Sequence, residues 1–122
     1  MLLIRNDPDH QSHWTSEHHE QFLEKCESYI NDLKRNGNLI AAQPLVREGT
    51  IIAGKKRAWK DIPYNETGEV QVGYYHILAN DMDDATEITK LNPEFEYSET
   101  ARIEVRPVQI AEQTTGFVYP KK

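Results

Sequence analysis

The stretch EVQVGYYHILA, from Glu69 to Ala79, decides the fold because nearly every position in it is apolar or aromatic. In an extended strand, successive side chains point to opposite faces. Strict alternation gives two sets, with Val70, Val72, Tyr74, His76 and Leu78 on one face and Gly73, Tyr75, Ile77 and Ala79 on the other. A strand that is apolar on both faces must be covered on both faces. The sequence therefore predicts a central strand with packing partners above and below it.

Two segments show the three- and four-residue spacing of apolar positions that is typical of amphipathic helices. The first is 16–36, which has Thr15 or Ser16 as its N-cap and Gly37 after its last turn. Its apolar stripe consists of His19, Phe22, Leu23, Cys26, Tyr29, Ile30 and Leu33. The second helix lies within 80–93, where Asp81 is the predicted cap and the Asn-Pro pair at 92–93 ends the helix.

Three shorter segments complete the predicted sheet. Residues 2–5 read as a first strand, and residues 38–46 as a second strand that Pro44 restricts to an edge or a bulge. Residues 101–107 alternate apolar and charged side chains and predict the last strand. Between the second strand and Glu69, a twisted hairpin or an irregular arm is expected. The tail from Val108 is mixed, and its GFVYP string could add a short strand.

The order strand, helix, strand pair, strand, helix, strand predicts an α+β fold of the ferredoxin-like split βαβ type, with both helices on one face of an antiparallel sheet. The whole chain of 122 residues reads as one domain, with a core at 2–108 and a tail at 109–122. Two short helices cover one sheet face only. We therefore expect a second copy of the chain to cover the other face through a two-fold interface.

Composition excludes several classes of protein. The net charge is −6, with 20 acidic and 14 basic residues, whereas a nucleic-acid binder needs a basic stripe. The basic run 55–57 is interpreted as a solvated hairpin edge. Cys26 is the only cysteine, so no intramolecular disulfide and no cysteine-based zinc site is expected. The absence of a long apolar segment predicts a cytoplasmic protein that binds no membrane. No phosphate-binding loop, nucleophile elbow or nucleotide fingerprint occurs, so no cofactor is expected.

Four strings, in this order, resemble the YCII-related family in its DGPF-type branch. They are NGNLIAAQPL, KDIPYNETGE, VGYYHILANDMDDATEITKLNP and IEVRPV, and the resemblance spans Leu2 to about Val108. Asp61, Pro63, Glu66 and Glu69 match the namesake loop, whereas Ile62, Tyr64 and Gly68 replace its glycine, phenylalanine and lysine, and Gln43 replaces the glycine of a Gly-Pro turn. Because Ile62 does not adopt positive φ as glycine does, the backbone of the loop is expected to differ.

The resemblance implies a homodimer of the dimeric α+β barrel type with a pocket between sheet and helix near the subunit boundary. It implies no settled reaction. Relatives in the wider superfamily include isomerases and dehalogenating enzymes that act on small ring compounds, and some members are encoded near or fused to alternative sigma factors. Simpler members are thought to use a helix histidine and an aspartate after the second strand. Alignment on Gly37 places Cys26 and the region of Glu48 at those positions, so neither residue is matched.

Two histidines are the candidate catalytic bases. His19 lies on the stripe of Cys26, about 10 Å along the helix axis, and either serves the pocket or packs on Phe22 and Leu23. His76 interrupts an apolar strand face, where a buried imidazole needs partners for both nitrogens. It is either a satisfied interface residue or a titrating group on a pocket floor. Cys26 is most simply a small core residue.

The remaining candidates concern anions, rings and metals. Arg102, Glu104 and Arg106 form a row on one strand face and are expected to pair with Asp61 and Glu66 of the loop or across a dimer. Alternatively, Arg106 binds an anionic substrate, because guanidinium matches a carboxylate. The predicted substrate-binding set is Asp61, Tyr64, Tyr75, Glu104 and Arg106. The acidic loop with Asp7, Asp9, His10 and His13 is interpreted as solvated, so no metal site is predicted.

These observations lead to two hypotheses about function. The first is a small homodimeric enzyme that binds an anionic or aromatic molecule and catalyses proton transfer of the isomerase or lyase type, with His19 or His76 as base and Arg106 as anchor. The second is a non-catalytic regulatory or interaction protein, linked to transcription through a sigma factor.

Overall fold

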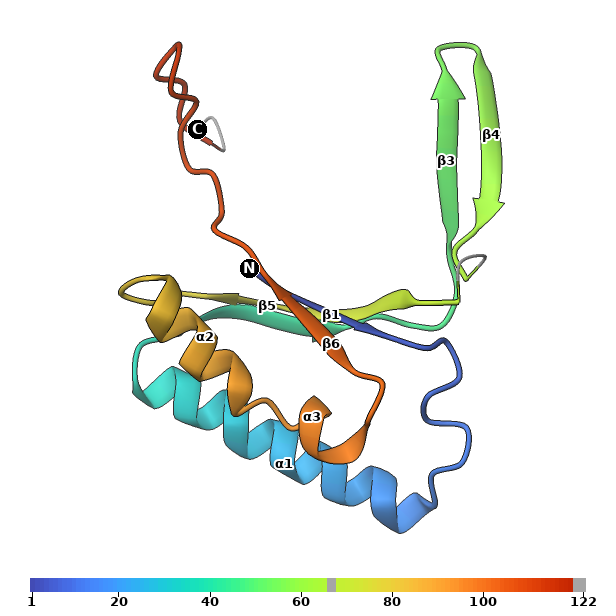
Figure 1. Ribbon diagram of the computed structural model, residues 1–122, viewed down its shortest axis with the longest axis vertical. Coiled ribbons are helices and arrows are strands. Elements are labelled where there is room, and N and C mark those ends of the chain that lie inside the picture. Colours follow the sequence, from blue (N-terminus) through green and yellow to red (C-terminus); the bar gives the residue numbers. More distant parts are fainter. Residues whose placement is uncertain (66–67, 120–122) are drawn as a thin grey trace.

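The computed structural model describes residues 1–65 and 68–119 and has the predicted α+β architecture (Figure 1). Its elements are β1 (Leu2–Asn6), α1 (Ser16–Arg35), β2 (Leu39–Pro44), β3 (Thr50–Lys55), β4 (Ala58–Pro63), β5 (Val70–Ile77), α2 (Met82–Lys90), α3 (Glu94–Tyr97) and β6 (Arg102–Val105). The one-turn helix α3 was not expected from the sequence. In the part of the chain that the structure describes, no helix is long and apolar enough to cross a membrane.

The main sheet has four strands in the order β2-β5-β1-β6, and all neighbouring strands are antiparallel. This is the order of a ferredoxin-like split βαβ fold, with β5 between β1 and β2. All three helices lie on one face of the sheet (Figure 1). β2 is an edge strand and Pro44 is its last residue, as the sequence predicted for that proline.

The two long helices begin and end at the predicted signals. Thr15 caps α1, because its side-chain Oγ1 accepts a hydrogen bond of 3.1 Å from the backbone N–H of His18. Gly37 follows the helix in the left-handed region at φ 72°, which glycine adopts without steric cost. Asp81 caps α2, because its Oδ1 accepts from the backbone N–H of Asp84 at 2.8 Å.

The two faces of β5 differ from strict alternation. A β-bulge in the pairing of β1 with β5 places Ile4 opposite Gly73 and Arg5 opposite Gln71, so Val72 has no partner of its own. Residues on the two sides of this bulge therefore exchange faces. Val70 and Val72 are buried together with Tyr75 and Ile77 in the core that the helices cover.

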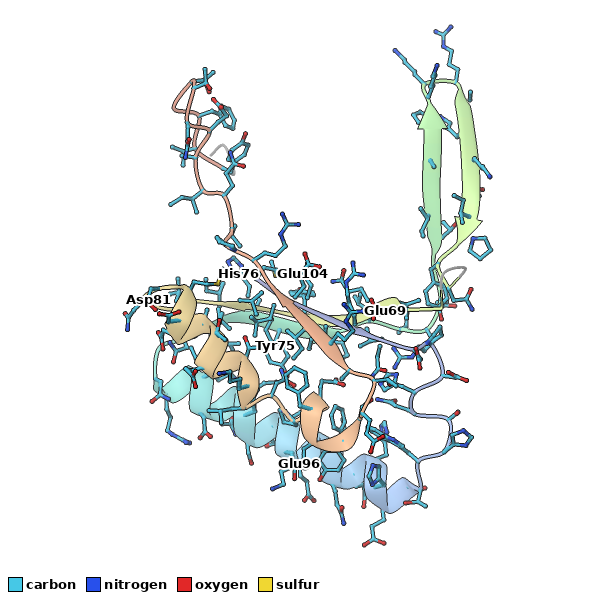
Figure 2. The ribbon with its side chains drawn as sticks, viewed as in Figure 1. Glu69, Tyr75, His76, Asp81, Glu96 and Glu104 are labelled. Atoms are coloured by element: carbon cyan, nitrogen blue, oxygen red, sulfur yellow. The ribbon has the colours of Figure 1, made fainter. Side chains whose placement is uncertain are left out.

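The expectation that Val70 and Val72 share a face with Tyr74 and His76 is therefore wrong. Tyr74 and His76 lie half-buried on the open face of the sheet, and the exposed Gln71 accompanies them. Figure 2 shows Tyr75 directed toward the helices and His76 on the opposite side. The open face of β5 is thus aromatic and polar.

Two segments project from the open side of the sheet (Figure 1). One is the predicted hairpin of β3 and β4, which pairs from Thr50–Pro63 to Lys55–Ala58 and exposes 64% of Trp59. The other is the segment after β6, in which the predicted GFVYP strand contributes a single bridge between Ala111 and Val118. Pro120 at the end of that string lies outside the described residues.

Candidate functional site

A cavity of about 460 Å³ lies between α1 and the sheet, and we call it the helix–sheet cavity. α1 contributes Phe22 and Cys26, β2 contributes Ala42, β5 contributes Val72 and Tyr75, and α3 contributes Glu94. Ligand pockets are typically concave and mostly apolar, with a few polar groups that orient the bound molecule. This cavity matches that description. Its polar lining consists of the Glu94 carboxyl, the Tyr75 phenol and the Cys26 thiol, together with the side chains of Glu27, Asn31, Lys34 and Gln43.

Glu94 is the most unusual of these groups. Its side chain belongs to a residue that is only 9% exposed, and Oε2 has no hydrogen-bond partner among the described residues. Its backbone N–H donates to Asn92 Oδ1 at 3.0 Å, which holds the start of α3 in place. Burial raises the pKa of the Glu94 carboxyl, and the positive charge of Arg47 partly opposes this. A carboxyl with a raised pKa exchanges protons closer to neutral pH than an exposed glutamate does.

The thiol and the phenol of the cavity are neutral at physiological pH. Burial raises the pKa of Cys26 to about 12, so the reactive thiolate is rare and a nucleophilic role is disfavoured. Burial also raises the pKa of the Tyr75 phenol, whose ring contacts that of Tyr29 edge to face at 5.5 Å between centroids. Tyr29 donates to the backbone carbonyl of Ile88 at 2.8 Å and ties α1 to α2.

His19 does not line the helix–sheet cavity. Its ring lies 5.9 Å from that of Trp14, with which it borders a shallow depression at the start of α1. Trp14 in turn contacts Phe22 at 5.1 Å and Tyr97 at 6.1 Å between ring centroids. The structure therefore places His19 at the outer side of an aromatic cluster that borders the cavity. Its catalytic role stays a prediction.

The structure brings two other predicted residues together. His76 and Arg106 both line a second cavity of about 340 Å³, at the end of the sheet where β5 and β6 end and α2 begins. Met82 and Ile110 add apolar walls to this sheet-end cavity. Arg106 also pairs with Glu104, with 3.6 Å between Nε and Oε2, and its side chain is 66% exposed.

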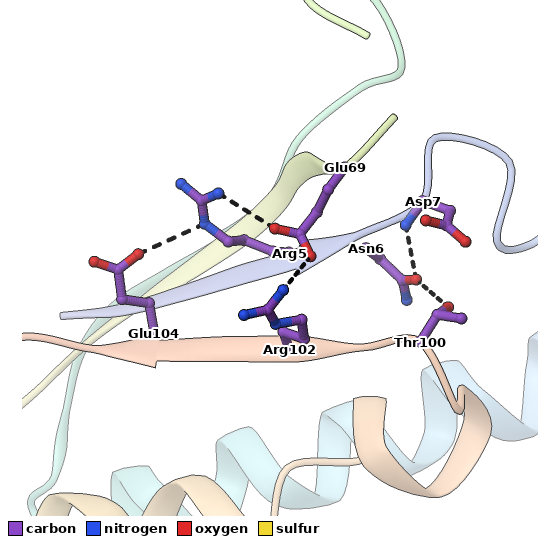
Figure 3. A network of polar contacts seen from close by, with 7 residues as sticks. All are labelled: Arg5, Asn6, Asp7, Glu69, Thr100, Arg102 and Glu104. Atoms are coloured by element: carbon purple, nitrogen blue, oxygen red, sulfur yellow. Dashed lines mark hydrogen bonds and ion pairs between the residues drawn. The ribbon is translucent and has the colours of Figure 1, made fainter. Parts of the chain in front are cut away.

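The predicted arginine row exists, but its acidic partner differs from the one expected (Figure 3). Glu69, just before β5, pairs with Arg5 at 3.4 Å and with Arg102 at 3.5 Å. Arg5 also lies 3.6 Å from Glu104. The network joins β1, β5 and β6, so it supports the structural role that the sequence suggested for the row.

Asp61 and Tyr64 lie away from both cavities. Asp61 is exposed on β4 opposite Ile52 of β3, so the expected pairing of Asp61 with the arginine row is wrong. The hairpin carries it away from the sheet (Figure 1). Glu66, the other expected partner, lies outside the described residues. Tyr64 is partly buried and packs against the hydrophobic core. Within 1–65 and 68–119, no three His, Cys, Asp or Glu side chains converge on a metal position.

The family model of the YCII-related domain matches residues 1–109, which include every helix and strand described above. The chain belongs to the YCII-related family. The resemblance found in the sequence is thereby confirmed, and its assignment to the DGPF-type branch is consistent with the match. No curated protein matches the chain. The helix–sheet cavity of this YCII-related protein lies between sheet and helix, as the family resemblance implied for a pocket, and Cys26 lines it.

Sequence reasoning missed Glu94 completely. In the string NPEFEYSE, nothing local separates Glu94 from the exposed Glu96 and Glu99. The distinction arises because α3 turns Glu94 toward α1 and β5, whereas Figure 2 shows Glu96 directed away from the sheet. A possible signal was the Asn-Pro pair before it, because a stop of this kind often starts a tight turn.

Proposed function

We propose that this YCII-related protein binds a small molecule in the helix–sheet cavity and transfers protons to and from it, with Glu94 as the acid and base. The observation that carries the proposal is the buried Glu94 carboxyl, whose Oε2 lacks a partner in the described chain and whose pKa is raised by burial. A carboxyl whose pKa is raised by burial inside a cavity is a candidate catalytic acid and base. Family membership is compatible with this activity.

The cavity supplies the parts that a proton transfer next to a carbonyl group requires. Ionised Glu94 removes a proton from the carbon beside the carbonyl. The C–H electron pair forms the C=C bond of the enolate, and the π pair of the carbonyl moves to its oxygen. The neutral phenol of Tyr75 donates a hydrogen bond to that oxygen as negative charge develops on it. When the substrate carries a β,γ double bond, the anion is a dienolate, and protonated Glu94 then returns the proton to its γ carbon. The net reaction is an isomerisation without a cofactor.

The test is solvent exchange in D₂O, followed by ¹H NMR on 2-oxobutanoate and on butanone. The wild-type protein is expected to accelerate loss of the proton beside the carbonyl. Glu94→Gln keeps the shape of the side chain but removes the base, so exchange is expected to slow by about 10²–10⁴-fold. Glu96→Gln is the matched control, because Glu96 is exposed on the same short helix. Exchange that is equal in Glu94→Gln and the wild type would show that another group is the base.

The exchange assay, combined with native mass spectrometry, separates catalysis from regulation. Native mass spectrometry of the protein as purified reports both a tightly held small molecule and the mass of the oligomer. A bound molecule without any catalysed exchange would favour the non-catalytic regulatory alternative. A loss of that molecule in Cys26→Phe, in which the ring fills the cavity, would place it in the helix–sheet cavity.

We propose that two copies pair through the open sheet face, between the two projecting segments. An isolated two-stranded hairpin is marginally stable in water, yet β3 and β4 stand apart from the sheet with Ile52 65% exposed. Ile110 of the opposite segment is 71% exposed. A partner on the open face would bury both segments. Native mass spectrometry is expected to find a dimer, and Tyr74→Lys on the open face is expected to yield monomers.

The sheet-end cavity supports a second candidate site, because His76 and Arg106 meet there. In this alternative, Arg106 holds an anion and His76 accepts or donates a proton beside it. The NMR titration of the His76 ring decides the matter. A pKa that moves when benzoate is added, and that no longer responds in Arg106→Gln, would support this site. A ring that is unaffected by the anion would exclude it.

A further inference from the structure

Arg47 lies in the loop after β2, close to the helix–sheet cavity. Pro44, the last residue of β2, lines the cavity, and the backbone N–H of Leu45 continues the pairing with Val72 at 2.9 Å. Two residues later, Arg47 Nη2 contacts both ring nitrogens of His10, at 3.1 and 3.3 Å. The strand pairing and the contact with His10 therefore hold the guanidinium between the loop before α1 and the end of β2.

A chain of ring contacts connects this position with the cavity wall. The ring centroids of His10 and Trp14 are 6.1 Å apart, and those of Trp14 and Phe22 are 5.1 Å apart. Phe22 lines the cavity. The positive charge of Arg47 also favours the ionised form of Glu94, which is consistent with a guanidinium close to that carboxyl. The cavity therefore has a buried acid inside and an arginine nearby.

Within the part of the chain that the structure describes, Arg47 lacks the carboxylate partner that most arginines of this chain have. Arg5, Arg35, Arg102 and Arg106 each form an ion pair with an Asp or Glu side chain. Within the described residues, the only hydrogen-bond partner of the Arg47 guanidinium is a ring nitrogen of His10. When His10 Nδ1–H donates to the carbonyl of Asp7 at 3.0 Å, Nε2 is the acceptor. One neutral acceptor leaves most of the five N–H donors available.

We propose that Arg47 binds the carboxylate of the ligand at the mouth of the helix–sheet cavity, and that the ligands are small monocarboxylic acids with a flat apolar body. The inference rests on the proposed function, because it assigns the substrate class of the same cavity. The apolar body enters between α1 and β5, whereas the carboxylate stays outside with the guanidinium, because burying it beside Glu94 would place two acids together. Two parallel hydrogen bonds from the fork fix the orientation of the ligand relative to Glu94.

The test uses benzoate and benzamide, which share a ring and differ in charge, with affinities measured by isothermal titration calorimetry. The wild-type protein is expected to prefer benzoate. Arg47→Gln should weaken the binding of benzoate by about 10- to 100-fold, which is the usual contribution of charged hydrogen bonds. The affinity for benzamide should stay unchanged. The benzoate affinity of Arg47→Lys should fall between those of the wild type and Arg47→Gln, since lysine keeps the charge but lacks the forked guanidinium. Arg57→Gln at the tip of the β3–β4 hairpin is the control, because it removes the same charge from an exposed site that does not line the cavity.

The outcomes separate the two proposals. If Arg47→Gln binds benzoate as the wild type does, the carboxylate anchor is wrong, although the cavity can still bind ligands. If the wild type binds neither compound, the cavity is not a ligand site and both proposals fail. Protection of Cys26 from alkylation by bound benzamide provides a second readout, which needs no substitution and reports on the cavity itself.

Discussion

Replacing Glu94 by methionine is expected to stabilise the protein while it removes the proposed acid and base. Methionine fits the same space, has no oxygen that requires a partner and keeps the backbone N–H bond to Asn92. In the wild type, Oε2 of Glu94 is buried without a hydrogen-bond partner in the described chain. The substitution removes this unfavourable group. Residues of this kind are retained in proteins where function requires them, at the expense of stability.

The structure sets the size of the expected effect. A buried polar group without a partner costs about 1–3 kcal/mol, so Glu94→Met should raise the free energy of unfolding by roughly that amount. For a domain of this length, each kcal/mol of added stability raises Tm by about 4 °C. The expected rise in Tm is therefore about 4–12 °C. Glu96→Met is the matched control. It lies on the exposed side of α3 and should change the stability by no more than about 0.5 kcal/mol.

The pH dependence gives a second check with a definite sign. Because the folded pKa of Glu94 is raised above its usual value of 4.5, the folded state binds this proton more tightly than the unfolded state does. The contribution of the protonated Glu94 carboxyl to the free energy of unfolding is fully present below pH 4.5. It is lost as the pH rises through the folded pKa. The advantage of Glu94→Met should therefore grow with pH from 4.5 upward.

The measurement is urea denaturation followed by circular dichroism, at several pH values between 4 and 8 and at one protein concentration. A fixed concentration matters because dimerisation would couple stability to mass action. If Glu94→Met is no more stable than the wild type at any pH in this range, the carboxyl is satisfied in solution, and the reasoning from its orphaned oxygen fails.

Three further predictions use other parts of the molecule. Cys26, with a pKa of about 12 in place of 9.0, should react with iodoacetamide at pH 8 about 1,000-fold more slowly than an exposed thiol, and urea should restore the ordinary rate. His10, whose pKa is lowered first of all by burial, should make the protein less stable as the pH falls below 6.5; His10→Gln should lose this dependence in denaturation curves and His13→Gln should keep it. Glu69→Gln should cost about 0.5–1 kcal/mol and lose that effect in 1 M salt, since its pairs with Arg5 and Arg102 are partly exposed; an equal cost at both salt concentrations would contradict an electrostatic role.

The sequence alone determined which segments form helices and strands and how they follow one another. The stripe of α1, the Thr15 and Asp81 caps and the left-handed Gly37 are local features, since each depends on neighbours within a few residues. The order of elements then restricts the sheet to few topologies, because connections are short and follow fixed handedness. That information was sufficient for the ferredoxin-like fold and for family membership.

Tertiary structure alone decided which residues share a face, a cavity or an ion pair. The bulge in β5 depends on pairing with β1, so no pattern within 69–79 could reveal that Val72 joins the core. Glu69 rather than Asp61 meets the arginines because the hairpin carries Asp61 away from the sheet. Glu94 differs from Glu96 only through its position against α1 and β5. Burial and desolvation arise between segments that are distant in sequence, and they turn an ordinary glutamate into a candidate acid and base.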